Sequence, residues 1–369
     1  MNWSQKNVWL LVGFILIGIF IVVFTTNDQR FYHEPIAKIN TVKKVSSTKV
    51  EDEFNNVDYQ TVQQLTATIL NGEHKGEKVS IQNTYSKSQA MDQKYRQGDQ
   101  VFLTQMKKHD GKLTASIKGY KRDTVVAFLG WLVVFVLIMS MGRAGFFALI
   151  SVIINTILFV VAIFLDLRMQ GNNIILLFSC LAVIFVFISL MLILGISKKM
   201  LATFAATVIG TLLATLIGIL VLNMTHNKDV YYESMEYVTQ VPRSLFIIEI
   251  ILGALGAIMD EATDIVATLF ELKELDPNVS RGQLFMAGRN IGRSIMGPLV
   301  NVLFLIFIAD TFTSTLLYLK NGNSWGYTFN MNMSLGMVQS LISGIGIVLT
   351  VPVVSLFGAL LLGRRDSNN

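Results

Sequence analysis

The sequence is poor in charge, proline and cysteine, and each shortage excludes a class of protein. Charged residues make up 15% of the 369 residues, whereas hydrophobic residues make up 52%. A soluble globular domain normally has about a quarter of its residues charged, so a single soluble globule is excluded. Five prolines exclude a collagen-like or proline-rich chain. The one cysteine, Cys180, excludes a disulfide framework and a thiolate metal cluster.

Long apolar runs are what the sequence has in abundance. A helix that crosses a bilayer needs roughly 20 apolar residues, and eight segments approach that length. The sequence therefore predicts a mostly α-helical membrane protein with about eight transmembrane helices, the last of which can tilt or break at Pro352. The segments lie at 8–26, 124–142, 144–165, 174–196, 200–223, 244–260, 295–313 and 335–362.

The first apolar run is interpreted as an uncleaved anchor. Lys6 precedes it, as in a signal peptide, but residues 24–28 (FTTND) lack the small residues of a cleavage site. The chain then divides into an anchor at 1–26, a polar region at 27–123 and a multi-helix membrane domain at 124–369.

The polar region at 27–123 is predicted to be a small β domain. Apolar and polar residues alternate in four segments, with Asn71-Gly72 and Asp110-Gly111 as turns between them. This spacing favours an OB-like barrel or a small sandwich, and residues 33–58 are expected to form a linker. The four segments are 59–70, 77–83, 100–106 and 112–120.

The distribution of lysine and arginine predicts the orientation in the membrane. With the N-terminus in the cytoplasm, the inner loops and ends hold ten of these residues and the short outer loops hold four. Both termini are then cytoplasmic and 27–123 is extracytoplasmic. That region holds 16 basic and 12 acidic residues, without interleaved aromatic residues. Nucleic-acid binding is therefore not predicted, despite the net charge of +5.

No catalytic pattern is present in the sequence. The four histidines lie outside the apolar segments, and no HExxH, GxSxG or Walker motif occurs. We therefore predict no catalytic residue, no metal site, no cofactor and no enzymatic activity.

An acidic stripe is the main candidate for chemistry in the membrane domain. At helical spacing, Glu249, Gly253, Gly256, Asp260 and Asp264 fall on one face. Carboxylates beside small residues can bind a cation, carry a proton or pair with an arginine. In the alternative reading, Asp260, Asp264 and the adjacent Glu261 mark the inner membrane boundary.

A second polar stripe follows in the next helix. Asn290, Ser294, Gly297 and Asn301 share one face, and Arg293 flanks it as a candidate partner of Asp260 or Asp264. The step Gly297-Pro298 can break that helix and free carbonyl groups as ligands. The predicted packing or hinge positions are Gly253, Gly256, Gly292, Gly297 and Pro298.

Two motifs carry a resemblance to a known family. Residues 253–260 (GALGAIMD) and 290–297 (NIGRSIMG) resemble the YibE/F family of bacterial membrane proteins, over roughly 124–362. The outer β domain is similar to that of the YibE-like type. The resemblance implies a multi-pass protein of the bacterial plasma membrane and a YibF-like membrane partner. Ser294 and Pro298 depart from the pattern, which has an acid and a small polar residue there.

The leading hypothesis is a transporter or permease-like protein that works in a homo- or hetero-oligomer in the lipid bilayer. Asp260 and Glu249 would be the cation or proton sites, with Asp264 and Arg293 as a gating or structural pair. Asn290 and Asn301 would be neutral ligands. The alternative is a non-transporting envelope or assembly factor whose outer domain binds wall polymer, lipid or a protein.

Overall fold

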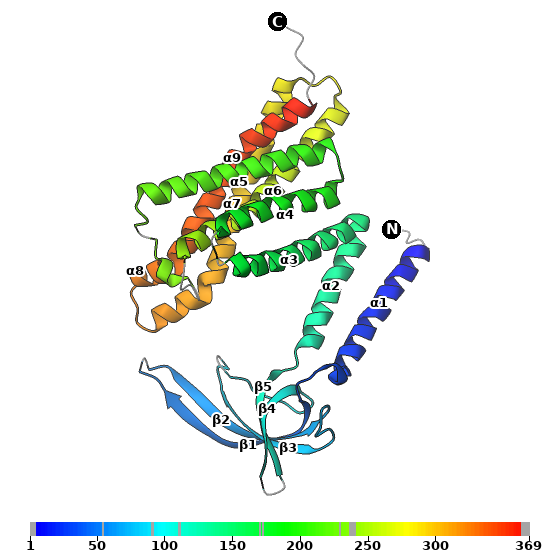
Figure 1. The fold of residues 1–369 in the computed structure, drawn as a ribbon, viewed down its shortest axis with the longest axis vertical. Helices are drawn as coiled ribbons and strands as arrows, with labels where there is room; N and C mark the ends of the chain where they lie inside the picture. The colour runs from blue at the N-terminus through cyan, green and yellow to red at the C-terminus, as the bar shows by residue number, and fades with distance from the viewer. Residues whose placement is uncertain are drawn as a thin grey trace. The chain divides into compact units, whose positions relative to one another are not determined.

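The chain folds into two compact units, Met1–Gly142 and Arg143–Asn369, coloured from blue to red along the sequence in Figure 1. The structure is a computed structural model. It describes residues 5–53, 55–89, 92–109, 112–169, 171, 173–228, 230–235 and 241–362.

The first unit joins a helix pair to a β-barrel. Helix α1 (Gln5–Thr26) precedes the barrel and α2 (Asp123–Met141) follows it. The two helices pack through aromatic side chains. A Cβ placed on Gly18 would lie 2.6 Å from the Trp131 ring, and the rings of Phe14 and Phe135 are 5.8 Å apart. Glycine is therefore needed at position 18 for α1 to approach the indole.

Five strands form a closed barrel in the order β1-β2-β3-β5-β4. Neighbours are antiparallel except for a short parallel pairing of β3 with β5, and β1 closes the barrel against β4. The core holds inward-facing aliphatic residues such as Ile39, Leu65 and Ile81. The β-rich prediction and its four strands are thus confirmed. The strands are β1 (Ile36–Glu51), β2 (Val57–Ile69), β3 (Lys78–Ser86), β4 (Gln100–His109) and β5 (Lys112–Tyr120).

The expected linker at 33–58 is wrong, because most of it is β1, the longest strand. Register shifts at Asn40 and Val45 interrupt the alternation, and every residue of the strand after Asn40 is exposed. An exposed strand with bulges lacks the period-two pattern that reveals strands in sequence. The expected turn at Asp110-Gly111 lies outside the described residues.

Every helix or strand that the structure describes in the second unit is a helix. Each predicted apolar segment forms a helix, and in the part of the chain that the structure describes six helices are long and apolar enough to cross a membrane. Of the other two segments, the one in α1 forms a shorter apolar helix, Leu11–Thr26. The segment 244–260 of α6 contains Glu249 and Asp260, and Glu261 follows it directly. The helices of this unit are α3 (Arg143–Met169), α4 (Ile174–Leu194), α5 (Lys198–Met224), α6 (Pro242–Leu275), α7 (Arg281–Lys320), the short α8 (Trp325–Thr328) and α9 (Ser334–Leu362).

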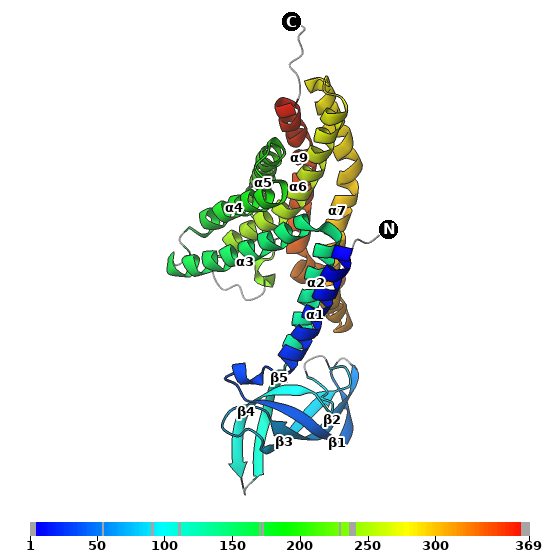
Figure 2. The same cartoon turned by 90° about the vertical axis from the view of Figure 1, so that its right-hand side faces the viewer.

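Helix α9 is central to the second unit and packs against α5, α6 and α7, as Figure 2 shows for α6 and α7. Along α6, Ile258 contacts Gly346 and Leu269 contacts Gly358, so α6 and α9 run in the same direction. On α7, Gly288 contacts Ser355 and Gly292 contacts Val351, so α7 runs in the opposite direction. Small residues on both helices permit these close approaches.

Neither proline breaks its helix. Helix α7 continues through Pro298 and α9 continues through Pro352, so the break considered at Gly297-Pro298 is absent. Proline removes one backbone donor and disturbs one turn, but in a membrane domain neighbouring helices and hydroxyl groups can compensate for this.

Candidate functional site

The acidic stripe of α6 faces away from the helix bundle. Glu249, Gly253, Gly256, Asp260 and Asp264 are all exposed. The opposite side of the helix is buried against α5 and α9 and carries the apolar residues Ile250, Ala254, Ile258 and Ile265. The structure therefore gathers the predicted carboxylates on one surface of α6.

The polar stripe of α7 also faces away from α9. Asn290, Ser294, Gly297 and Asn301 are exposed, as are Arg293 and Pro298. Gly292 lies on the other side of the helix, buried against Val351. Among the described residues, no ion pair joins Arg293 to Asp260 or Asp264.

The charged residues of the two stripes nevertheless lie at a similar depth in the bundle. Ile258 contacts α9 at Gly346, and Gly292 contacts α9 five residues later, at Val351. Because α6 runs parallel to α9, the level of Val351 corresponds to α6 residues a few positions beyond Ile258. Arg293 is therefore near the level of Asp260 and Asp264.

Gln339 of α9 adds an amide to the acidic stripe. Its Nε2 donates to the carbonyl oxygen of Glu249 at 3.2 Å. A Cβ on Gly253 would lie 2.6 Å from that same nitrogen. Gly253 thus makes room for a polar side chain of the central helix, which the sequence pattern of α6 alone does not reveal.

Glu261 differs from the other acids of α6 because it is completely buried. Its exposed fraction is 0%, and neither carboxylate oxygen has a hydrogen-bond partner. The neighbouring Ala262 and Ile265 belong to a core cluster built with residues of α5, α7 and α9. Glu261 is therefore inside the bundle and not at a solvent-exposed boundary, the alternative considered from the sequence.

A sequence signal for this residue does exist. Glu261 is 11 residues after Ile250, 7 after Ala254 and 4 before Ile265, which places it on the apolar face of the helix. An acid on the buried face of a membrane helix is a candidate functional residue by default. The more conspicuous acidic pattern, which includes Asp260 and Asp264, lies on the exposed face.

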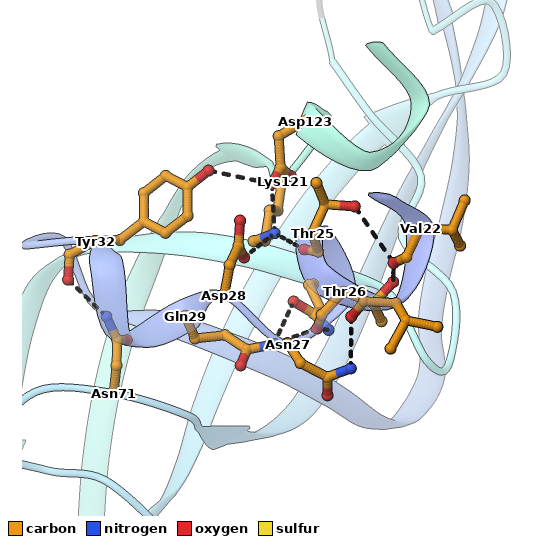
Figure 3. Close-up of polar contacts among 12 residues, drawn as sticks. Val22, Thr25, Thr26, Asn27, Asp28, Gln29, Tyr32, Asn71, Lys121 and Asp123 are labelled. Carbon is orange, nitrogen blue, oxygen red and sulfur yellow. Dashed lines mark hydrogen bonds and ion pairs between the residues drawn. The ribbon is translucent and has the colours of Figure 1, made fainter. Parts of the chain in front are cut away.

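A second cluster of charges lies in the first unit, where the barrel joins its helices (Figure 3). Lys121 follows β5, and its side chain is 2% exposed. Its Nζ lies 2.7 Å from Asp28 Oδ1 and 2.6 Å from Asp123 Oδ2, and it donates to the carbonyl of Thr25. The hydroxyl of Tyr32 donates to Asp123 Oδ2 at 3.1 Å.

This cluster ties together the end of α1, the end of β5 and the start of α2. Burial alone would lower the pKa of Lys121, but hydrogen bonds and attraction to Asp123 and Asp28 raise that pKa above the ordinary lysine value. The ammonium group is therefore charged at neutral pH and balances the two aspartates. We assign it a structural role at the junction.

Lysine and tyrosine side chains gather on and next to strands β1, β2 and β3. The hydroxyls of Ser47 and Thr61 are 3.0 Å apart, so β1 and β2 are in side-chain contact next to these residues. Tyr59 is paired with Lys49, and Tyr85 with Thr61. We call this surface the Lys–Tyr face; it comprises Lys44, Lys49, Tyr59, Tyr85, Lys87 and Lys94.

Each tyrosine of the Lys–Tyr face has a lysine over its ring. Lys87 Nζ lies 5.8 Å from the Tyr59 ring centre, and Lys94 Nζ lies 5.8 Å from that of Tyr85. Glu51 partly offsets the charge through an ion pair with Lys49 at 3.1 Å. Within the described residues, no group of three histidine, cysteine or acidic side chains could hold a metal ion.

Comparison with known proteins gives two family matches. The model of the YibE/F-like protein matches residues 117–364, and the model of the YibE/F family N-terminal domain matches residues 30–120. The YibE/F-like match covers the second unit up to residue 364, and the N-terminal-domain match covers the barrel. No curated protein and no solved structure matches the chain.

Proposed function

We propose that this protein, which belongs to the YibE/F family, is a permease-like transporter of the bacterial plasma membrane, coupled to a cation or a proton. The supporting observation is the exposed acidic stripe of α6 and, at a similar depth, the exposed polar stripe of α7, in a domain of long apolar helices. Ionisable side chains are costly in a membrane, and they usually mark substrate or ion pathways.

The roles follow from the positions of the side chains. Asp260 and Glu249 bind the cation or proton, and Asn290 and Asn301 supply neutral ligand groups. Asp264 and Arg293 lie near one depth and form a gating or structural pair when the helices shift or when a second chain, such as a YibF-like partner, covers this surface. Both termini are cytoplasmic, and the barrel is extracytoplasmic.

The test measures ion binding without requiring a known substrate. Full-length protein in proteoliposomes adsorbed on a solid-supported membrane is subjected to pH jumps and to Na⁺ jumps. An ion that binds within the membrane moves charge and produces a transient current. We expect Asp260→Asn to reduce this current at least about tenfold. A tenfold change in binding corresponds to one pKa unit, or about 1.4 kcal/mol.

The matched control is Glu274→Gln, an exposed acid near the end of the same helix. Its current should equal that of the wild-type protein. Equal currents from wild type, Asp260→Asn and Glu274→Gln would exclude the role of Asp260, and a wild-type protein without any current would contradict transport.

The second candidate function is an envelope factor, and the Lys–Tyr face favours it. The sequence favours an OB-like barrel for this domain, and OB-folds bind polymers across their second and third strands. Here those strands carry Tyr59 and Tyr85, each with a lysine over its ring. An anionic wall polymer fits this composition. This function needs no ion binding, so a wild-type protein that produces no current supports it.

A further inference from the structure

Among the residues that the structure describes, none donates a hydrogen bond to the carboxyl group of Glu261. Its exposed fraction is 0%, and no donor reaches either oxygen. Glu249, Asp260 and Asp264 on the same helix are exposed instead. Glu261 is therefore a different kind of site from the acidic stripe. Whether its carboxyl group is charged depends on the residues inside the helix bundle.

Within the described residues, no ion pair joins a cation of α5, α7 or α9 to this acid. Residues 200–224 of α5 and 334–362 of α9 contain no charged side chain. On α7, the charged residues near this depth are Arg289 and Arg293, and both are exposed. Lys199 at the start of α5 lies over the ring of Phe270 instead, at 5.1 Å.

The packing keeps water away from Glu261. One turn before it, Ile258 fills the contact with α9 so closely that a Cβ on Gly346 would lie 2.7 Å from its Cδ1. Two turns after it, Leu269 lies 2.5 Å from the Cβ position of Gly358. Because α6 and α9 touch on both sides of this level, solvent reaches the acid only when the helices separate.

An ionised carboxylate without partners is strongly unfavourable in such a place, whereas the neutral acid is tolerated. A metal cation is not the natural occupant, because hard cations require several oxygen ligands. Ile258, Ala262 and Ile265 flank Glu261 on the buried face of α6, and within the described residues no group of three histidine, cysteine or acidic side chains could hold a metal ion. We infer that Glu261 is a proton-binding site, which holds one proton while α6 is packed on α9 and exchanges it when α6 moves away.

This inference rests on the proposed function and deepens it. It names the proton as the ion that is coupled to transport. A carboxyl group that is reachable only in one arrangement of the helices would bind a proton in one state and release it in another. Proton binding then favours the packed arrangement, because only the neutral acid fits there. The exposed acids of α6 provide groups that can accept the released proton.

The test uses the reaction of protonated, buried carboxyl groups with the hydrophobic reagent dicyclohexylcarbodiimide. The acid transfers its proton to a carbodiimide nitrogen, its oxygen adds to the central carbon, and an acyl shift to nitrogen gives a stable N-acylurea with no group lost. Full-length protein in lipid vesicles is treated with this reagent or with a water-soluble carbodiimide, and the modified peptides are quantified by mass spectrometry.

We expect dicyclohexylcarbodiimide to modify Glu261 at least about tenfold faster than Glu274, with a rate that falls as the pH is raised. The water-soluble reagent should reverse this preference, and the adduct at this position should be absent in Glu261→Gln. A lack of preference for Glu261 overturns the inference, and so does protection by Na⁺ at constant pH, which would indicate a sodium site. The wild-type measurement does not depend on whether the variant folds.

The current measurement separates this inference from the proposed function. Selective modification of Glu261 in a protein that shows no current supports the proton site and contradicts transport. Currents that persist in Glu261→Gln, together with an unmodified Glu261 in the wild type, leave transport in place and overturn the proton site.

Discussion

At the scale of single residues, burial separates charged groups that the sequence presents as equivalent. Lys118 lies in β5, and Lys121 directly follows that strand. The Lys121 side chain is 2% exposed and contacts two aspartates. Lys118 pairs with Glu34 at 2.5 Å, but the two side chains are 59% and 48% exposed. Lys121 is shielded from water, whereas Lys118 and Glu34 are not. Only the removal of Lys121 therefore leaves a carboxylate that solvent cannot readily stabilise.

We therefore expect Lys121→Met to lower the stability of the first unit by about 3 kcal/mol, because the buried Asp28 and the partly buried Asp123 lose their counter-ion. Lys118→Met should cost about 1 kcal/mol or less, because an exposed pair is screened by water. Trp131 lies in the α1–α2 contact, so thermal unfolding followed by tryptophan fluorescence in detergent is a suitable measurement. Equal destabilisation by the two changes would contradict the structural role of the cluster.

The sign of the pH dependence follows from the raised pKa of Lys121. A group whose folded-state pKa exceeds its ordinary value of 10.5 stabilises the fold below that value and ceases to do so as the pH rises through the folded-state pKa. The difference between wild type and Lys121→Met should thus be constant from neutral pH to about pH 10 and diminish above it.

At the scale of helices, glycines have different roles on the two sides of α7. Gly292 is buried against Val351, and a Cβ there would overlap that side chain. Gly297 has no heavy atom within 4 Å of its Cβ position and is exposed. The sequence motif contains both, and only the position of α9 distinguishes a packing glycine from one that faces outward.

Gly292→Ala should destabilise the second unit by about 1–3 kcal/mol, because the stiff valine side chain cannot move aside without strain. Gly297→Ala on the same helix should be neutral or stabilising by up to about 1 kcal/mol, since alanine is the better helix former. Thermal unfolding of both variants in the same detergent provides the comparison. A larger loss for Gly297→Ala would instead indicate that position 297 is a packing site or a hinge.

At the scale of the whole molecule, the two units have different tasks in one membrane protein. The first carries the barrel between two helices, and the second holds the acidic α6 among long apolar helices. The proposed orientation places the barrel outside the cell and the α6–α7 connection in the cytoplasm, as the lysine and arginine distribution predicts.

Single cysteines test this orientation in a Cys180→Ala background. A membrane-impermeant maleimide added to intact cells should modify Gln97→Cys in the barrel. It should modify Glu274→Cys at the end of α6 only after permeabilisation. Both positions are exposed, so access differs only through the side of the membrane. The reverse pattern would contradict the proposed orientation, and the assignment of the barrel to the outside with it.

The sequence by itself determined the class, the family and most of the elements. Apolar runs and alternating strands are local patterns, so the helices and four of the five strands were predictable. Strand β1 was not, since its bulges at Asn40 and Val45 and its exposed outer half depend on pairing with β2. The effect of Pro298 also needed the structure, because neighbouring helices decide whether a helix continues through a proline.

The spacing along α6 places Glu261 on the apolar face, but only the tertiary structure decided that its side chain is completely buried. Asp260 and Glu261 are adjacent in sequence, yet the first is exposed and the second has an exposed fraction of 0%. Successive residues of a helix point about 100° apart, and the sequence does not specify which neighbouring helix covers each direction. Helix α9, placed against Ile258 and Leu269 by its own glycines, covers the side of α6 that carries Glu261.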